Sequence, residues 1–264
     1  MRSSIWYHGV CSDTLGIYIE RRPPRIIPQR RYTRYTIPGR SGEKLKMQRG
    51  WENYIQPYEI AIVPLLTETD LSKQIDKVAE WLLYPGDYQR LEDSYNPGVY
   101  RLAAVTNAME VTNQLSKFGR ATLQMECAPE RWLLSGEEAL SIDPVESLIL
   151  RNPTPNMAEP EIRITGTGDV GFRVFNTTAK LDVTVSLAIG TRSKMIIFDL
   201  QKGADASYSD GNSANSIVTI TPKSTSTYAK IPVLPTIGNT EISPLTDTEG
   251  AISGMTVKPR WFIT

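Results

Sequence analysis

Few side chains of this sequence could do chemistry. His8 is the only histidine, and it lies three residues before Cys11, one of two cysteines. A histidine can activate a cysteine as a nucleophile when a third group orients the imidazole. No such group is evident, so a histidine packed at the edge of a sheet is the stronger interpretation. Cys11 and Cys127 are far apart and lack metal-ligand spacing, so we expect two reduced thiols, at buried positions.

Paired acidic residues are the second chemical candidate. Glu137 with Glu138, or Asp143 with Glu146, could act as glycosidase carboxylates if a cleft gathered them. Adjacent acids on loops are more often solvated, and one histidine cannot build a multi-histidine metal cage. We therefore predict no catalytic residue, no metal ligand, no cofactor-binding residue and no cofactor. An enzyme is the least favoured class of function.

The most unusual stretch is basic and runs from residue 21 to residue 49, with ten Lys or Arg side chains against one acid, Glu43. At its centre, Gly39-Arg40-Ser41-Gly42 separates two segments that contain apolar and aromatic residues. Because glycine tolerates positive φ, this tetrapeptide permits the tight turn of a β-hairpin, with residues 31–37 and 43–55 as arms. The sequence therefore predicts a protruding basic hairpin.

Several roles are open for this hairpin. The phosphate-loop pattern GxxxxGK[ST] is absent, so phosphate binding is weakly supported. Arginines interleaved with tyrosines could bind nucleic acid, although the chain is balanced at 29 basic and 29 acidic residues. The charges could also simply solvate the hairpin. Exposed strands tend to pair with another chain, and head-to-tail pairing can close a ring. Our hypothesis is an oligomer interface formed by Gly39, Arg40, Ser41, Gly42, Glu43, Trp51 and Tyr54.

The elements that must position these residues are mainly β. Strict alternation places Leu123, Met125 and Cys127 on one face, and residues 181–189 alternate in the same way. We predict further strands at 58–65, 161–165, 170–175, 195–200 and 216–221. One helix is predicted near 69–84, capped by Thr69 or Asp70 and stopped by Pro85-Gly86. Its apolar stripe is Leu71, Ile75, Val78 and Leu82.

Composition predicts two domains, residues 1–135 and residues 136–264. The first contains the helix and nearly all of the basic excess, and the second reads as a β-sandwich. The first residues contain no apolar run suited to a signal peptide, and no stretch is long enough for a membrane span. We therefore expect a soluble protein that is made without export and has no membrane anchor.

Several longer segments follow one another in a distinctive order. They are WYHGVCSDTLGIYIERRPPRIIPQRR, PGRSGEKL, YEIAIVPL, IDKVAEWLLYPGDYQRLEDSYNPGVYRLAAV, LQMECAPERW, NPTPNMAEPEIRITGTGDVGFRVFN, KMIIFDLQKGADAS and VKPRWF. In this order the chain resembles the distal tail proteins (Dit) of long, flexible-tailed bacteriophages (siphoviruses). The resemblance covers nearly the whole chain and depends on order and spacing, since no single motif is diagnostic. Ser41 departs from the family, in which an acidic residue is common there.

The resemblance implies an N-terminal ring-forming β-domain and a C-terminal galectin-like β-sandwich. It implies a homo-hexameric ring, which relatives can stack in isolation, at the virion tail tip of a phage whose proteins are made in the host cytoplasm. The ring would join the tail tube protein to tail-tip or baseplate proteins, such as tail-associated lysins or receptor-binding proteins, and leave a channel for DNA. The alternative is a carbohydrate-binding or adhesin module for host-surface glycans, although the sequence offers no residue-level sugar site.

Overall fold

The computed structural model describes residues 3–65, 70–106, 111–114, 118–203, 205–246 and 250–264. Within these residues the chain is mainly β with one α-helix, which confirms the predicted fold class. The chain divides into two compact units, residues 1–131 with Thr264 and residues 132–263. The sequence placed this division at residues 135/136.

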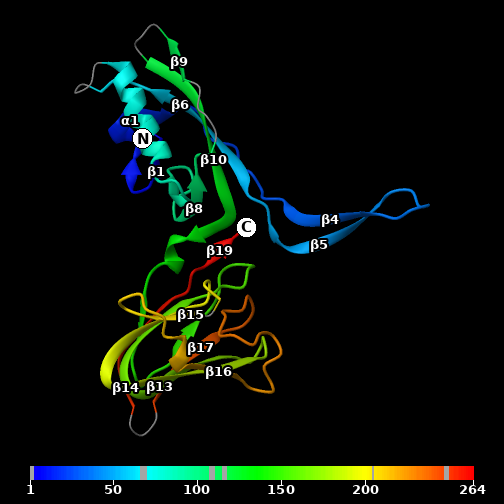
Figure 1. Cartoon of the computed structure of the whole chain (residues 1–264), viewed down its shortest axis with the longest axis vertical. Helices are drawn as coiled ribbons and strands as arrows, with labels where there is room; N and C mark the ends of the chain where they lie inside the picture. Colours follow the sequence, from blue (N-terminus) through cyan, green and yellow to red (C-terminus); the bar gives the residue numbers. More distant parts are fainter. Residues whose placement is uncertain (1–2, 66–69, 107–110, 115–117, 204, 247–249) are drawn as a thin grey trace. The chain divides into compact units, whose positions relative to one another are not determined.

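One sheet forms the body of the first unit (Figure 1). Its strands lie in the order β2-β1-β7-β8-β10-β6-β3, and β9 pairs with β10 beside this path. The strands are β1 (Ile5–Tyr7), β2 (Val10–Cys11), β3 (Ile17–Ile19), β6 (Tyr54–Ile62), β7 (Gln89–Asp93), β8 (Val99–Ala104), β9 (Val111–Gln114) and β10 (Phe118–Leu133), with a short 3-10 helix at Ser12–Leu15.

The helix α1 (Leu71–Leu83) packs into the core of this unit. Asp70 caps it by accepting a hydrogen bond of 3.0 Å from the backbone N–H of Ser72. Thr69, the other predicted cap, lies outside the described residues. The predicted stripe is confirmed, with Ile75 half-buried and the other three members buried. The alternating residues of β10 are also buried as predicted: Leu123, Met125 and Cys127.

The second unit is a β-sandwich built around two long paired strands, β13 (Glu161–Asn176) and β14 (Leu181–Asp199). The first part of β13 pairs with β18 (Ala251–Lys258), and its second part pairs with β17 (Thr240–Thr246). Apolar side chains from both parts share one hydrophobic core. The remaining strands of this sheet are β11 (Leu140–Ile142), β12 (Leu148–Leu150), β15 (Asp205–Tyr208) and β16 (Val218–Pro222), with 3-10 helices at Leu134–Gly136 and Asn215–Ile217. The short strand β19 (Phe262–Ile263) is not part of this sheet and pairs with β10.

Two glycines allow the long strands β13 and β14 to bend. The β13–β14 register shifts on either side of Gly168, which pairs with Gly190, and both glycines have positive φ, 71° and 83°. Residues with a Cβ rarely adopt that conformation. The segments 161–165 and 170–175, predicted as separate strands, are therefore one bent strand. The same correction applies to 181–189 and to the following 195–200, whose residues up to 199 complete β14.

Candidate functional site

The predicted hairpin is present. Strands β4 (Arg30–Thr36) and β5 (Glu43–Trp51) form a separate two-stranded antiparallel sheet, which projects from the first unit as an arm (Figure 1). Six residues, 37–42, connect the strands, so the connection is longer than a two-residue turn. Gly39 and Gly42 have φ of 78° and 86°, as the sequence predicts. We call residues 30–51 the basic hairpin.

The two faces of the basic hairpin differ in chemistry. Cross-strand pairing places Tyr32 opposite Met47 and Arg34 opposite Leu45 on one face. Tyr32, Leu45 and Met47 are 45%, 57% and 61% exposed, so this apolar face lacks cover within the chain. The opposite face carries polar and basic side chains, Thr33, Tyr35, Lys44, Lys46 and Gln48. A two-faced hairpin exposed on both sides is unusual for a monomer, because contiguous apolar patches normally mark interaction surfaces.

The base of the hairpin is fixed to the first unit by buried polar side chains. Gln56 donates from Nε2 to the carbonyl oxygen of Pro24 at 3.0 Å, and Arg131 donates from Nη2 to the carbonyl oxygen of Ile26 at 3.2 Å. Gln56 and Arg131 are 1% and 5% exposed. Gln56 also accepts a 3.3 Å hydrogen bond from Arg101, which is buried beside Asp93. The chain leading into β4 is therefore held by a buried network.

A second cluster supports the chain where it leaves β5. Asn53 donates to Glu126 at 2.9 Å and to the Tyr88 hydroxyl at 2.6 Å, and Tyr88 donates to Glu126 at 2.6 Å. The hydrogen bonds from Tyr88 and Asn53 lower the pKa of Glu126. Partial burial and the acceptor Glu126 raise the pKa of Tyr88 to about 12. At neutral pH Glu126 is therefore ionised and Tyr88 is neutral. We interpret the cluster as structural support.

The residues predicted as an oligomer interface lie at three places. Residues 39–42 are in the exposed connection, and Glu43 begins β5, where it forms an ion pair with Arg34 at 3.4 Å. Trp51 ends β5, with the Arg30 guanidinium 4.3 Å from its ring centroid. Tyr54 lies apart from the hairpin, because it begins β6 and is 8% exposed in the core. Tyr54 is therefore a core residue of the first unit, and the interface role of the set stays a prediction.

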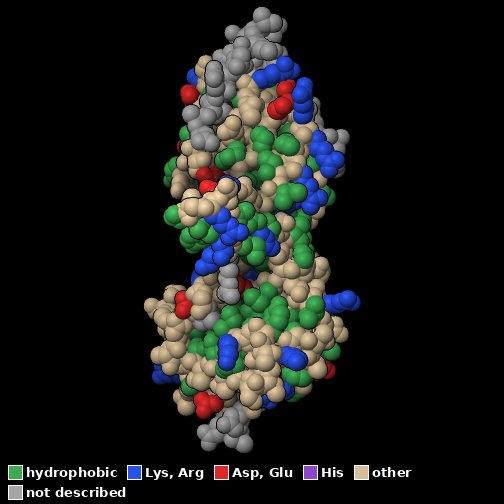
Figure 2. All heavy atoms as spheres, turned by 90° about the vertical axis from the view of Figure 1, so that its right-hand side faces the viewer, with side chains coloured by type: hydrophobic (Ala, Val, Ile, Leu, Met, Phe, Trp, Pro, Cys, Tyr) green, Lys and Arg blue, Asp and Glu red, His purple; other side chains and the backbone are tan. Residues whose placement is uncertain are grey.

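Positive charge dominates the exposed surface near the hairpin. The basic hairpin itself contains seven Lys or Arg residues and one acid. Figure 2 views the molecule from the side toward which the hairpin projects, and Lys and Arg side chains gather there over the first unit, beside apolar ones.

Sequence reasoning did not identify the anchors Gln56 and Arg131. The available signal for Gln56 was a polar residue at an inward position of an alternating strand.

The cysteine and histidine do not form a reactive pair. His8 and Gly9 make the two-residue turn between β1 and β2, with φ of 50° and 76°, which suits a type I′ turn. The His8 Nδ1 lies 2.8 Å from Oε1 of Gln89. Burial raises the pKa of the Cys127 thiol to about 12, so the thiolate is scarce at neutral pH. Cys11 is half-buried, contrary to the expected burial of both thiols.

The acidic pairs lie in exposed turns. Asp143 accepts a 3.0 Å hydrogen bond from the backbone N–H of Val145, and its carbonyl accepts from the N–H of Glu146. Glu138 is exposed, and Glu137 is half-buried at the end of a 3-10 helix. Across the described residues, no group of three His, Cys, Asp or Glu could hold a metal ion. None of the helices within the described part of the chain is long and apolar enough to cross a membrane.

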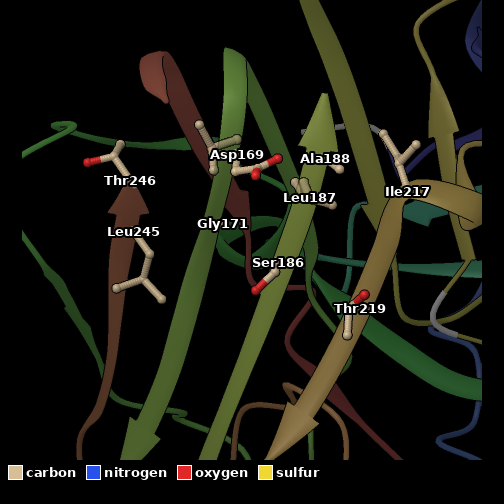
Figure 3. A pocket seen from close by; sticks show the side chains of 10 residues that line it. Asp169, Gly171, Ser186, Leu187, Ala188, Ile217, Thr219, Leu245 and Thr246 are labelled. Atoms are coloured by element: carbon tan, nitrogen blue, oxygen red, sulfur yellow. The ribbon is translucent and has the colours of Figure 1, made fainter. Parts of the chain in front are cut away.

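A groove of about 450 Å³ crosses one outer layer of the second unit (Figure 3). Its floor consists of the small residues Gly171, Ser186 and Ala188, and Leu245 and Thr219 lie on either side. Asp169 adds a carboxylate at one end. Hydroxyl and carboxylate groups of this kind can hydrogen-bond a neutral ligand rich in hydroxyls. The described lining contains neither an aromatic ring nor a basic side chain.

Similarity to known proteins is found among solved structures. No protein-family model and no curated protein matches the chain. The crystal structure of the Dit (gp19.1) protein of phage SPP1 is similar over 97% of this chain and 98% of that one, with a TM-score of 0.65 and 15% identity. That protein is described as a paradigm of the hub adsorption apparatus in phages that infect Gram-positive bacteria. This chain therefore has the fold of a phage distal tail protein, as the order of its sequence segments led us to expect.

Proposed function

We propose that this chain is a structural protein of a phage tail tip and that six copies form a ring hub. The observation that carries the proposal is the basic hairpin, an exposed two-faced arm on a rigid base within a chain that has the Dit fold. A hairpin fixed at its base costs less conformational entropy on docking than a loose loop. Repeated head-to-tail docking closes a ring when the rotation between copies fits.

In this proposal the ring joins the tail tube protein to tail-tip proteins, such as a tail-associated lysin or receptor-binding proteins. DNA crosses the central channel in transit, and the chain is not an enzyme. Because each neutralised phosphate adds affinity, an arginine-rich channel would retain DNA. Residues 21–49 are therefore expected to face neighbouring subunits or other tail proteins, which leaves the channel wall neutral or acidic.

Single-particle imaging of the purified chain tests this proposal. The expected result is a sixfold ring with an open channel, either single or as two stacked rings, and with the hairpins at subunit boundaries. Hairpin arginines lining the channel would overturn the assigned orientation. A population of separate, unassembled chains at micromolar concentration would overturn the ring itself.

A carbohydrate-binding function is the second candidate, and the groove of Figure 3 is the observation that favours it. Ala188 is exposed on the groove floor, so Ala188→Trp fills the groove without disturbing the core. If the groove binds glycans, retention of the chain on cell-wall polysaccharide falls by about tenfold or more in this variant, because the indole occupies the space of the ligand. The control Met195→Trp, an exposed position outside the groove, leaves retention unchanged. Equal retention of both variants and the parent chain would remove this candidate.

A further inference from the structure

An arginine occupies the buried face of β10. The inward positions of this strand run from Leu123, Met125 and Cys127 through Pro129 to Arg131, which is only 5% exposed. Apolar side chains normally fill such positions of an alternating strand. A charged side chain there needs a partner of opposite charge, because removing a charge from water is costly unless the charge is paired.

The described part of the chain does not supply that partner. A guanidinium group has five N–H donors. In Arg131, Nη2 donates to the carbonyl oxygen of Ile26 at 3.2 Å, whereas Nε is buried without a hydrogen bond. The neighbouring Arg101 differs, since it lies 3.5 Å from the Asp93 carboxylate and donates to Gln56. Among the described residues, Arg131 is therefore a buried cation without a counter-charge.

A second arginine lies beside this charge at an exposed position. Arg25 directly precedes Ile26, the residue whose carbonyl oxygen Arg131 holds. Burial lowers the pKa of the Arg131 guanidinium, and the positive charges of Arg101 and Arg25 lower it further. Arg131 still stays protonated at neutral pH, as arginine does in proteins. Because like charges repel, an anion held by Arg25 and Arg131 would stabilise both side chains.

The Tyr54 hydroxyl is an unused polar group close to the same charge. Its oxygen is buried without a hydrogen bond of ordinary geometry, beside the thiol of Cys127, which is a weak partner. The charge of Arg131 acts on this hydroxyl. Guanidinium and phenol groups can all donate, so the cluster suits a ligand that only accepts. An ionised carboxylate only accepts, and it matches the planar guanidinium in shape.

We propose that Arg131 and Arg25 bind one carboxylate group, with the Tyr54 hydroxyl as a further donor. A carboxylate suits a largely buried site better than a phosphate, because it is smaller and its single charge costs less to desolvate. The group comes either from a free carboxylate ion or from an Asp or Glu side chain of a neighbouring copy. Once bound, it ties Arg25 to the core of the first unit, in the segment that leads into β4. The inference does not depend on the proposed ring.

Thermal unfolding in potassium acetate tests the site, because a ligand that binds only the folded chain raises the unfolding midpoint. Potassium chloride at the same ionic strength is the reference. At about 0.1 M acetate we expect the midpoint of the parent chain to rise by about 3 °C or more relative to chloride. Arg131→Met should lose this rise, since methionine cannot donate to a carboxylate. An equal rise in Arg131→Met, or none in the parent chain, overturns the proposal.

Arg25→Met is a second variant, and its exposed position leaves the core intact. The acetate concentration that gives half of the stabilisation should increase by about tenfold, because a charge-assisted hydrogen bond is lost. The matched control is Arg22→Met, which removes an exposed arginine three residues earlier in the same segment and should respond to acetate as the parent chain does. Equal acetate responses of Arg25→Met and Arg22→Met overturn the paired-arginine site.

The oligomer mass in the same two salts distinguishes the sources of the carboxylate. If an acidic side chain of a neighbouring copy fills the site, acetate competes with it and the mass falls in acetate. If the natural ligand is a free ion, the mass is equal in both salts while the midpoint still rises. A fall in mass that is equally large in Arg131→Met overturns the assignment to a neighbouring copy.

Discussion

At the residue scale, the hairpin depends on side chains that lie outside it. Gln56 and Arg131 donate to the carbonyl oxygens of Pro24 and Ile26, and both donors are buried. The buried side chains of Gln56 and Arg131 need partners, because an unsatisfied buried polar group costs about 1–3 kcal/mol. These two residues therefore hold the entry to β4 in one position, which a docking arm requires.

Gln56→Met tests this anchor. Methionine has a similar length but cannot donate to Pro24 or accept from Arg101, so both groups lose a partner. We expect the free energy of unfolding, measured with urea, to fall by roughly 1–3 kcal/mol. Gln48→Met, at an exposed hairpin position, is the control and should change stability by less than about 0.5 kcal/mol. Equal stability of the two variants would show that the anchor contributes little.

An ion pair between half-buried Arg173 and buried Asp182 in the second unit gives a pH prediction. Arg173 donates two hydrogen bonds of 2.7 Å to Asp182, and these lower the pKa of Asp182 below its usual 3.8. Asp182 is ionised more readily in the folded chain than in the unfolded one. The contribution of ionised Asp182 to the free energy of unfolding is therefore complete above its unfolded pKa of about 3.9. This contribution is lost as the pH falls through the folded pKa.

Asp182→Asn should accordingly be less stable than the parent chain at neutral pH. This difference should shrink below about pH 4, where the parent carboxylate also becomes protonated. Urea unfolding at about pH 6, above the unfolded pKa of Asp182, and at about pH 3, below it, checks the prediction. A stability difference that stays constant between the two pH values would contradict the assigned role of the charge.

At the scale of elements, local signals predicted the hairpin and the helix correctly. The Gly39 and Gly42 pair, the alternation in β10 and the Asp70 cap are each encoded within a few residues, and the structure confirms them. The continuous bent strand β13 was not predicted. Its continuity past Gly168 depends on pairing with β14, β17 and β18, partners that lie far along the chain.

The candidate site was predictable only in part, for the same reason. Residues 39–43 lie on the exposed arm as expected, whereas Tyr54 is buried because β6 pairs with β10 through Cys127. An apolar groove beside α1 is lined by residues from 8–15 and from 77–85. No short stretch of sequence reveals this groove, since it exists only when β1, β2 and α1 pack together.

Gly39→Val and Gly42→Val test the connection of the hairpin. Both glycines have positive φ, which a β-branched residue adopts at a cost of about 1–2 kcal/mol or more. A Cβ added at either position would meet no other atom within 4 Å, so the strain arises from the backbone alone. We expect loss of ring closure, measured as oligomer mass, with the core of each unit still folded.

The matched control is Gly211→Val, which has φ of 86° and equally open surroundings but lies in the second unit. This variant carries the same backbone strain and should still form rings. If Gly211→Val and the hairpin variants assembled alike, the hairpin connection would have no special part in closure.

At the scale of the whole molecule, charge is balanced overall but unevenly distributed. The chain has 29 basic and 29 acidic residues, while the basic hairpin has seven against one. The excess positive charge of the arm must therefore be matched by excess acid elsewhere in the same chain. A chain with complementary surfaces of this kind is suited to self-assembly without a large net charge on the product.

The central claim is that the chain closes into a ring through its hairpin, and the mass of the purified protein in solution tests it most directly. Light scattering after gel filtration should give six times the 29.5 kDa of one chain, or twelve times if two rings stack. The Gly39→Val chain should give a smaller mass under the same conditions. A mass of one chain for the unmodified protein at micromolar concentration would contradict the account.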